Sequence, residues 1–243
     1  MEQWKEQTAQ LKQWVEESNQ IVFFGGAGVS VPSGIPDFRG ENGLYSREYQ
    51  VPAEVILSHD YFFSHTAQFY DFCRKYLNYP DAKPNACHLR LAQLEKEGKL
   101  SAVITQNIDG LHQKAGSKTV LELHGNLDRN YCIHCDAFYD SSAPEMSEPV
   151  PHCSKCGGLI KPDVVLYGEG LDNSIISESI YALSHCDLCI VGGTSLSVWP
   201  AAGLIRAIPA NAKLVIINLS PTDQDQSADL VIRGSIDEVF RLI

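Results

Sequence analysis

Residues 25–40 read GGAGVSVPSGIPDFRG and directly follow the apolar run Ile21–Phe24, which has the composition of a buried strand. Glycines immediately after a strand permit a tight turn and let backbone N–H groups approach a phosphate at the start of the next helix. The spacing is close to the dinucleotide-binding fingerprint. However, Val31 occupies the third glycine position, and the acidic Asp37 comes about ten rather than about twenty residues on. The stretch predicts a nucleotide site unlike that of an ordinary dehydrogenase, with a purely architectural turn as the alternative.

Length and composition suit one large domain, alone or with a smaller module inserted. The 243 residues are 44% hydrophobic and 20% charged, with a formal net charge of −11. An acidic protein is poorly suited to non-specific nucleic-acid binding, because such binding neutralises phosphates with basic side chains. No apolar run is long enough to span a bilayer, and the polar N-terminus does not resemble a signal or transit peptide. We expect a cytoplasmic enzyme with no nucleic-acid or membrane partner.

Apolar runs alternate with amphipathic segments along most of the chain. The strand-like runs are 21–24, 102–105, 120–123, 163–166, 188–191, 214–218 and 230–232. The helix-like segments between or after them include 89–94, 175–183, 201–208 and 237–242. Because most of these strands are apolar throughout rather than alternating, they predict an α/β fold: a parallel sheet covered by helices on both faces.

Two segments interrupt this alternation. One carries aromatic residues at helical spacing, such as Tyr61 and Phe69, without a convincing strand. The other is polar and contains two cysteine pairs. We expect both to leave the sheet and form a smaller module. The expected division is a large domain of about 1–40, 84–125 and 161–243, and a small domain of about 41–83 and 126–160.

The two cysteine pairs have the CxxC pattern, at 132–135 and 153–156, with seventeen residues between them. This spacing is typical of a tetrahedral zinc site, and the glycines after the second pair suit a tight turn. The predicted ligands are Cys132, Cys135, Cys153 and Cys156. Four thiolates fill the coordination sphere, so the Zn²⁺ is predicted to be structural. A third pair, Cys186 and Cys189, lies at the start of an apolar strand and is expected in the core.

A second polar cluster directly follows the strand-like run 102–105. Gln106, Asn107 and Asp109 stand at the carboxyl end of that strand, where open α/β sheets bind ligands. The next strand ends in His124, followed by glycine. A histidine at the same edge of the sheet is well placed to act as a base. A structural histidine is the alternative.

The order of motifs along the chain resembles that of the sirtuins, the NAD-dependent protein lysine deacylases. The motifs are GAGxSxxSGIPDFRG, TQNIDGLHxxAG, ELHG, the paired CxxC knuckles, KPDVVxxGE, GTSLxVxPAA and INLSPT. The resemblance extends from about Ile21 to Phe240. It implies a Rossmann-like large domain, a small domain made of a zinc ribbon and a helical excursion, and NAD in the cleft between them.

The resemblance also implies site residues, motif by motif. The cofactor loop contributes Gly26, Ala27, Gly28, Ser30, Phe38 and Arg39. The pocket for the nicotinamide carboxamide contains Asp37, Ile108 and Asp109. The residues near the adjoining ribose are Gln106 and Asn107, and the general base is His124. The adenosine half is held by Thr194, Ser195, Asn218, Leu219, Ser220 and Ile236. The expected catalytic residues are His124, Asn107 and Asp109.

The implied reaction consumes NAD and deacylates lysine. The acyl oxygen attacks the anomeric carbon as nicotinamide leaves, His124 takes a proton from a ribose hydroxyl, and the products are free lysine and O-acetyl-ADP-ribose. The acyl-lysine protein or peptide is expected to add as a short strand. The residues expected to bind it are Val165, Leu166, Tyr167, Gly168, Glu169, Ser197 and Val198.

The chain departs from the sirtuin pattern at several positions. Tyr167 stands where Phe is more common. The branch that prefers succinyl-lysine carries a Tyr and, three residues later, an Arg. Here Tyr70 matches, but Cys73 takes the Arg position and Arg74 lies one residue further, about 100° around the helix. We therefore expect acetyl to be preferred. Alternative functions are a sirtuin-fold desuccinylase, a protein ADP-ribosyltransferase, an NAD-linked dehydrogenase and a non-enzymatic zinc-ribbon binding module.

Overall fold

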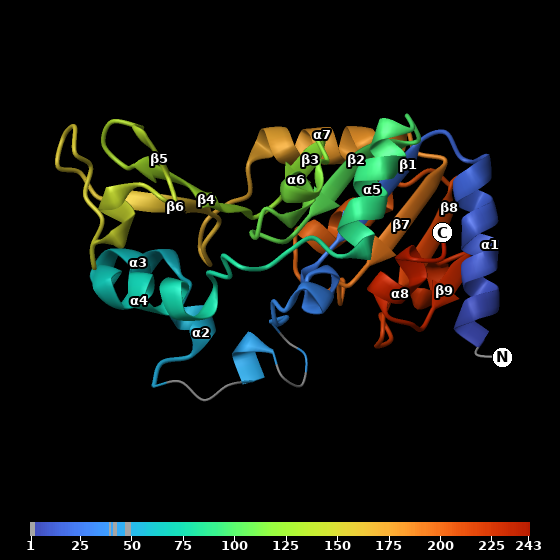
Figure 1. Ribbon diagram of the computed structural model, residues 1–243, viewed down its shortest axis with the longest axis horizontal. Coiled ribbons are helices and arrows are strands. Elements are labelled where there is room, and N and C mark those ends of the chain that lie inside the picture. Colours follow the sequence, from blue (N-terminus) through green and yellow to red (C-terminus); the bar gives the residue numbers. More distant parts are fainter. Residues whose placement is uncertain (1–2, 39, 41–42, 47–49) are drawn as a thin grey trace.

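The computed structural model describes residues 3–38, 40, 43–46 and 50–243, so the predicted cofactor-loop residue Arg39 lies outside the described residues. Two sheets lie next to each other along the long axis of the molecule (Figure 1). The strands of the larger sheet are β1 (Ile21–Gly25), β2 (Leu100–Thr105), β3 (Val120–Glu122), β7 (Leu188–Gly192), β8 (Lys213–Ile217) and β9 (Leu230–Ile232). The strands of the smaller sheet are β4 (Gly125–Cys132), β5 (Phe138–Asp140) and β6 (Ile160–Val164).

The larger sheet has the order β3-β2-β1-β7-β8-β9, and every neighbouring pair is parallel. The order reverses between β1 and β7, which is where open α/β sheets form a ligand crevice at the carboxyl ends of their strands. The register aligns Gly25 of β1 with Thr105 of β2 and Gly192 of β7. The motifs that follow these residues therefore begin at one edge of the sheet.

Helices cover both faces of this sheet, as predicted. In the described part of the chain, the α-helices of both modules are α1 (Gln3–Glu17), α2 (Ala53–Ile56), α3 (His59–Ser64), α4 (Thr66–Tyr76), α5 (Ala86–Lys96), α6 (Leu111–Ala115), α7 (Asn173–Ser184) and α8 (Ile236–Phe240). Ile21 and Phe23 of β1 belong to one core with residues of α1, α5 and α8. Val22 and Phe24 belong to another core with residues of α7 and the 3-10 segment Ala201–Ala207. Successive residues of this fully buried strand therefore pack on opposite faces of the sheet.

The smaller sheet is antiparallel, with β4 between β5 and β6. The strand expected at 163–166 lies at Ile160–Val164 and belongs here, so its expected place in the parallel sheet was wrong. Its burial shows why, because Ile160 and Pro162 are buried while the residues between and after them are partly exposed. Such alternation is typical of an antiparallel strand packed on one face.

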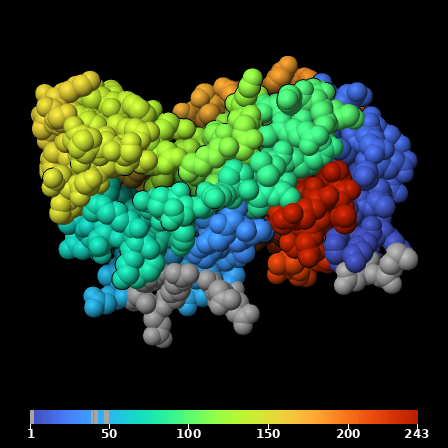
Figure 2. All heavy atoms as spheres, viewed as in Figure 1, coloured from blue at the N-terminus to red at the C-terminus, as the bar shows by residue number. Residues whose placement is uncertain are grey.

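The aromatic segment forms α2, α3 and α4, which pack against the smaller sheet. Phe62, Phe69 and Tyr70 share a core cluster with Leu166, just beyond β6. Figure 2 shows this helical segment and the smaller sheet together at one end of the molecule. Among the described residues, no helix is long and apolar enough to cross a membrane.

The chain after β1 differs from the prediction of a helix start. It forms two short 3-10 turns, Ala27–Val29 and Val31–Ser33. Gly34, with φ of +88°, ends the second turn, and Pro36 follows. Because proline and a left-handed glycine stand so close together, a regular helix cannot continue here. A helix macrodipole therefore does not contribute to anion binding at this loop.

Candidate active site and metal centre

The glycines of the cofactor loop are required by the approach of β7. The Gly28 N–H donates to the Gly193 carbonyl at 2.8 Å, and the Gly26 N–H donates to the Gly192 carbonyl at 3.1 Å. A Cβ atom on Gly28 would lie 2.7 Å from the Gly193 Cα, which is too close for any side chain. These two N–H groups are thus used within the protein, and the glycines bring the ends of β1 and β7 together.

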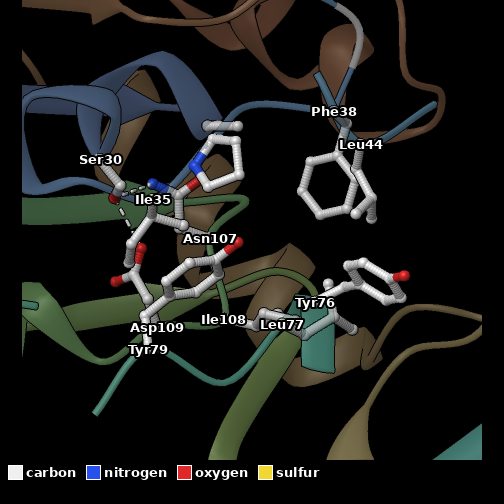
Figure 3. A pocket seen from close by; sticks show the side chains of 12 residues that line it. Ser30, Ile35, Phe38, Leu44, Tyr76, Leu77, Tyr79, Asn107, Ile108 and Asp109 are labelled. Carbon is white, nitrogen blue, oxygen red and sulfur yellow. Dashed lines mark hydrogen bonds between the residues drawn. The ribbon is translucent and has the colours of Figure 1, made fainter. Parts of the chain in front are cut away.

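Three predicted residues form one hydrogen-bonded network at this edge (Figure 3). The buried Ser30 hydroxyl donates to Asp109 Oδ2 at 2.6 Å and accepts from Asn107 Nδ2 at 3.1 Å. Asn107 Nδ2 also donates to the Gly26 carbonyl at 3.0 Å. The network therefore links the loop after β1 with the loop after β2, and it fixes the amide and the carboxylate relative to each other.

The Asp109 carboxylate is largely enclosed. Burial raises the pKa of Asp109, while hydrogen bonds from the Ser30 hydroxyl and the Leu111 N–H act in the opposite direction. The Leu111 N–H reaches Asp109 Oδ1 at 2.9 Å, so each carboxylate oxygen accepts a hydrogen bond. Asp109 is held in one orientation at the start of α6.

His124 is held by a backbone carbonyl. Its Nδ1 lies 2.9 Å from the Gln106 carbonyl oxygen. A carbonyl can only accept, so Nδ1 carries the hydrogen and Nε2 keeps its lone pair. Burial lowers the pKa of His124, and the bond to Gln106 opposes this shift. The neutral imidazole, with an acceptor nitrogen at Nε2, is the form that can take a proton near neutral pH.

A cavity lies beside the network. It is lined by Ala27, Ser30, Ile35, Pro36, Phe38, Leu44, Tyr76, Leu77, Tyr79, Asn107, Ile108 and Asp109. In Figure 3, Phe38 and Leu44 face Tyr76 and Leu77 across the cavity, and the polar network lies to one side. Among the residues expected to hold the carboxamide, Ile108 and Asp109 line this cavity. The Asp37 carboxylate instead accepts a hydrogen bond from the Gly40 N–H at 2.9 Å.

Sequence reasoning missed the wall that the end of α4 contributes. The aromatic spacing of this segment predicts helices but gives no sign that Tyr76, Leu77 and Tyr79 line the cavity. Proximity to the predicted cofactor loop arises from folding of the helical segment across it, so a local pattern carries no signal for it. Tyr76 and Leu77 line the cavity on the side away from Ser30, and Tyr79 lies beside Asp109 (Figure 3).

The residues expected around the adenosine half surround the ends of β7 and β8. Gln106 Nε2 donates to Thr194 Oγ1 at 3.1 Å, and Asn218 Nδ2 donates to the Thr194 carbonyl at 2.6 Å. Leu219 is 75% exposed, and Ser220 is also exposed. Ile236 is buried at the start of α8. Thr194 therefore connects the polar cluster after β2 with the loop after β8.

The segment expected to bind the peptide is anchored from two sides. The Val165 N–H donates to the His124 carbonyl at 3.0 Å. The Tyr167 N–H donates to the Leu57 carbonyl at 3.0 Å, and the His59 N–H donates to the Tyr167 carbonyl at 2.9 Å. The Leu166 N–H donates to the Glu169 carboxylate.

In the other segment expected to bind the peptide, the Ser195 and Ser197 hydroxyls lie 2.7 Å apart, and the Val198 carbonyl accepts a hydrogen bond from the Ala202 N–H.

The residues expected to decide the acyl preference lie away from this cavity. The Tyr70 hydroxyl donates to the Ile160 carbonyl at 2.7 Å, so it is used inside the small core. Cys73 is buried in the same cluster. The Arg74 guanidinium donates to the Met146 and Glu148 carbonyls and lies over the Tyr70 ring. None of these three side chains lines the cavity beside Asp109.

The two CxxC pairs meet at the end of the smaller sheet. The four Sγ atoms all lie within 4.8 Å of one another; they belong to Cys132, Cys135, Cys153 and Cys156. Tetrahedral zinc with Zn–S bonds near 2.3 Å requires sulfurs about 3.8 Å apart. Gly157 has φ of +74°, and a Cβ on Gly158 would lie 2.9 Å from Cys132 Sγ. The four thiols fit a structural Zn²⁺, and the two glycines make the predicted tight turn.

The third cysteine pair packs in the core, as expected. Cys186 and Cys189 are buried in the core on the α7 face of the large sheet, and the Cys186 thiol donates to the Leu183 carbonyl. Burial raises the pKa of Cys186 to about 11. Both thiols therefore stay protonated in the folded protein, and they behave as small apolar side chains.

Comparison with known proteins gives one consistent result. Residues 26–200 match the Sir2 family. A protein of Clostridium acetobutylicum, named NAD-dependent protein deacetylase, is 56% identical over 237 residues, with 96% of each chain covered. A Sir2 structure with a p53 peptide and NAD⁺ has a TM-score of 0.83 at 41% identity, covering 96% of this chain and 95% of that one. A Sir2 structure bound to acetylated peptide has a TM-score of 0.84 at 40% identity, covering 96% and 95%.

Proposed function

The chain belongs to the Sir2 family, and we propose that it is an NAD-dependent protein deacetylase that acts at the strand ends around His124. Its substrates are acetyl-lysine side chains of proteins or peptides, and its co-substrate NAD is consumed. The observation that carries this function is that Asn107 and Asp109 line one partly apolar cavity, while His124 is held by the carbonyl of Gln106, the residue directly before Asn107. We propose that this cleft lies between the large and the small domain, and that the enzyme works in the cytoplasm.

The proposed mechanism assigns a separate task to each part of the site. NAD, when bound, supplies the ribose carbon that accepts the acyl oxygen and the hydroxyl that later carries the acyl group. Asn107 and Asp109 border the nicotinamide side, where the Ser30 hydroxyl keeps both in fixed orientation. The apolar wall of Phe38, Leu44 and Leu77 excludes water from that side.

Proton transfer is assigned to His124. Its Nδ1–H is engaged by the Gln106 carbonyl, so a proton from the ribose hydroxyl is accepted at Nε2. The imidazolium that results is stabilised at Nδ1 by the same carbonyl. The zinc site would hold its ion with four thiolates, and with the coordination sphere filled it supports the smaller sheet rather than the reaction.

The preference for acetyl over succinyl is proposed because the residues that could meet a succinyl carboxylate are engaged elsewhere in the small core. A succinyl carboxylate needs a cation or several donors when it leaves water. The Tyr70 hydroxyl and the Arg74 guanidinium both have backbone partners already, and Cys73 carries no charge. We propose that acetyl-lysine is the better substrate by about a hundredfold or more in kcat/KM, since an unpaired carboxylate costs several kcal/mol.

The test is product analysis by mass spectrometry. The full chain is incubated with NAD and with matched peptides that carry acetyl-lysine or succinyl-lysine. The expected products are free lysine peptide, nicotinamide and O-acetyl-ADP-ribose in equal amounts, formed much faster from the acetyl peptide. Formation of NADH would instead indicate a dehydrogenase, and ADP-ribose attached to the peptide would indicate a transferase. Equal rates on both peptides would contradict the acyl preference alone.

A further inference from the structure

Two tyrosine hydroxyls from distant parts of the chain meet near Phe38, which lines the candidate cavity. Tyr45 belongs to the 3-10 turn Leu44–Ser46, and Tyr167 lies in the segment expected to bind the peptide. Their hydroxyl oxygens are 2.7 Å apart, although the residues are 122 positions apart in the chain. The chemistry proposed above assigns no role to either hydroxyl.

On one side, the pair is connected to the cavity wall. The Tyr45 N–H donates to the Phe38 carbonyl at 2.8 Å, and the two rings lie 5.5 Å apart. The preceding residue, Leu44, donates its N–H to the Asp37 carbonyl at 2.8 Å. Phe38 and Leu44 both point into the cavity beside Asp109 (Figure 3). The position of Tyr45 thus sets the position of two side chains that line the cavity.

On the other side, the pair is connected to the peptide segment. The Tyr167 backbone is held by Leu57 and His59 at the junction of α2 and α3. Tyr167 is 43% exposed, within the segment along which the peptide is expected to lie. The hydroxyl contact therefore joins a firmly anchored segment to the cofactor loop. A peptide seated along residues 165–169 would restrict the Tyr167 ring and exclude water from the hydroxyl pair.

We propose that the Tyr45–Tyr167 hydroxyl pair couples NAD binding to acyl-peptide binding, so that each ligand binds more tightly when the other is present. The inference rests on the proposed function, because it requires NAD in the cavity and peptide along residues 165–169. A hydrogen bond becomes stronger when water is excluded from it. Holding Tyr45 keeps Phe38 and Leu44 in place, which reduces the ordering that NAD must impose. Coupling between two binding sites is reciprocal by thermodynamic necessity.

The test is a cycle of single and double variants. Tyr45→Phe and Tyr167→Phe each remove one hydroxyl without removing a ring, and the double variant removes both. Tyr181→Phe, on the exposed surface of α7, is the matched control. Titration calorimetry gives the affinity for an NAD analogue that cannot release nicotinamide, with and without saturating acetyl-lysine peptide. The ratio of the two affinities is the coupling factor.

The expected coupling factor is about two- to tenfold in the parent and the control, the range of one neutral hydrogen bond. It should fall toward one in each single variant, with no further fall in the double variant. A parent factor of one, an unchanged factor in the single variants, or additive losses in the double variant would each overturn the inference. Nicotinamide release with acetyl peptide is measured in parallel on the parent. Its absence would refute the proposed function, whereas its presence with unchanged coupling refutes only the tyrosine pair.

Discussion

The chemistry of His124 depends on which of its nitrogens carries the hydrogen. The Gln106 carbonyl requires a donor at Nδ1, so the hydrogen bond selects the tautomer with a free lone pair at Nε2. Burial lowers the pKa of His124, which keeps the imidazole neutral at lower pH than an exposed histidine. A base works only when deprotonated, so the acidic limit of kcat/KM should lie below the ordinary histidine pKa of about 6.5.

The variant His124→Ala tests the base directly. We expect a folded protein that still binds NAD but retains no more than about one per cent of deacetylation, because general-base catalysis contributes about 10²–10⁴-fold. Steady-state deacetylation measures the loss, and calorimetry with NAD measures retained binding. A variant with more than a few per cent of parental turnover would remove His124 from the mechanism.

Among single elements, α5 joins the cofactor loop to the core. Asn85 caps its N-terminus by accepting from the Cys87 N–H at 3.0 Å. The same side chain donates through Nδ2 to the Val29 carbonyl at 2.8 Å and to Ser33 Oγ at 2.9 Å. One amide therefore stabilises a helix start and holds the 3-10 turns that carry Ser30.

The two tasks of Asn85 can be separated by substitution. Asn85→Asp keeps an oxygen for the helix cap but loses the two donors toward Val29 and Ser33. The new carboxylate oxygen would face the Val29 carbonyl as a second acceptor, so we expect KM for NAD to rise about tenfold with a smaller change in kcat, and the helix cap to persist. Asn85→Ala loses both tasks, and its unfolding free energy should fall by about 1 kcal/mol or more. Equal KM for NAD in the Asp variant and the parent would limit Asn85 to capping.

Helices α5 and α6 also meet through two buried histidines. His88 and His112 are 0% and 1% exposed, with ring centroids 4.6 Å apart. Among the described residues, His88 Nε2 and both His112 nitrogens have no hydrogen-bond partner. Burial lowers the pKa of His88 to about 4, against the field of Asp237, and that of His112 to about 3. Both rings are therefore neutral at physiological pH.

This pair predicts sensitivity to acid. The unfolded chain binds protons at these histidines below about pH 6.5, while the folded protein does not until about pH 4. The contribution of the two neutral histidines to the free energy of unfolding is complete above about pH 6.5. As pH falls below that value, this contribution is lost at a rate that approaches about 1.4 kcal/mol per pH unit for each histidine. Urea unfolding at pH 7.0, 6.0 and 5.0 gives the free energy of unfolding at each pH. This free energy should fall less steeply with decreasing pH in His112→Leu than in the parent. An equal slope would exclude His112 as a source of the acid sensitivity.

In the whole molecule, the two sheets join at the proposed base. His124 lies between the end of β3 and the start of β4, and Val165 after β6 donates back to its carbonyl. Arg129 on β4 contacts Glu122 at 2.6 Å and Asp163 at 2.8 Å, which joins β3 to the smaller sheet. The placement of His124 therefore depends on the smaller sheet as well as on the larger one.

Part of this arrangement could be predicted from the sequence, because the patterns that predict it involve residues close together in the chain. Continuous apolar runs predict the parallel strands, and cysteine spacing predicts the four thiols that lie together, because both patterns reflect residues close in the chain. The sheet to which Ile160–Val164 belongs could not be read from a short apolar run. Nor could the contact of Asn85 with Val29, or of Tyr45 with Tyr167, since these depend on how distant segments pack.

Removal of zinc tests the dependence of the site on the smaller sheet. Four thiolate ligands contribute the binding energy of the metal to folding, so a strong chelator should melt the smaller sheet. Because β4 and β6 flank His124, deacetylation should be lost in parallel with the structure of that sheet, while α1 and the core around β1 stay folded. Metal analysis should give about one zinc per chain before chelation. Circular dichroism follows the loss of structure during chelation.

The matched control is the double variant Cys186→Ala/Cys189→Ala, which removes the pair that packs in the core of the larger sheet. Its zinc content should equal that of the parent, although small cavities should lower its unfolding free energy by about 1 kcal/mol or more. Loss of zinc in this variant would mean that the ligands were assigned to the wrong pairs. Full deacetylation by the chelated parent would show instead that the larger sheet positions His124 without help, and that the contacts of Arg129 and Val165 are dispensable for catalysis.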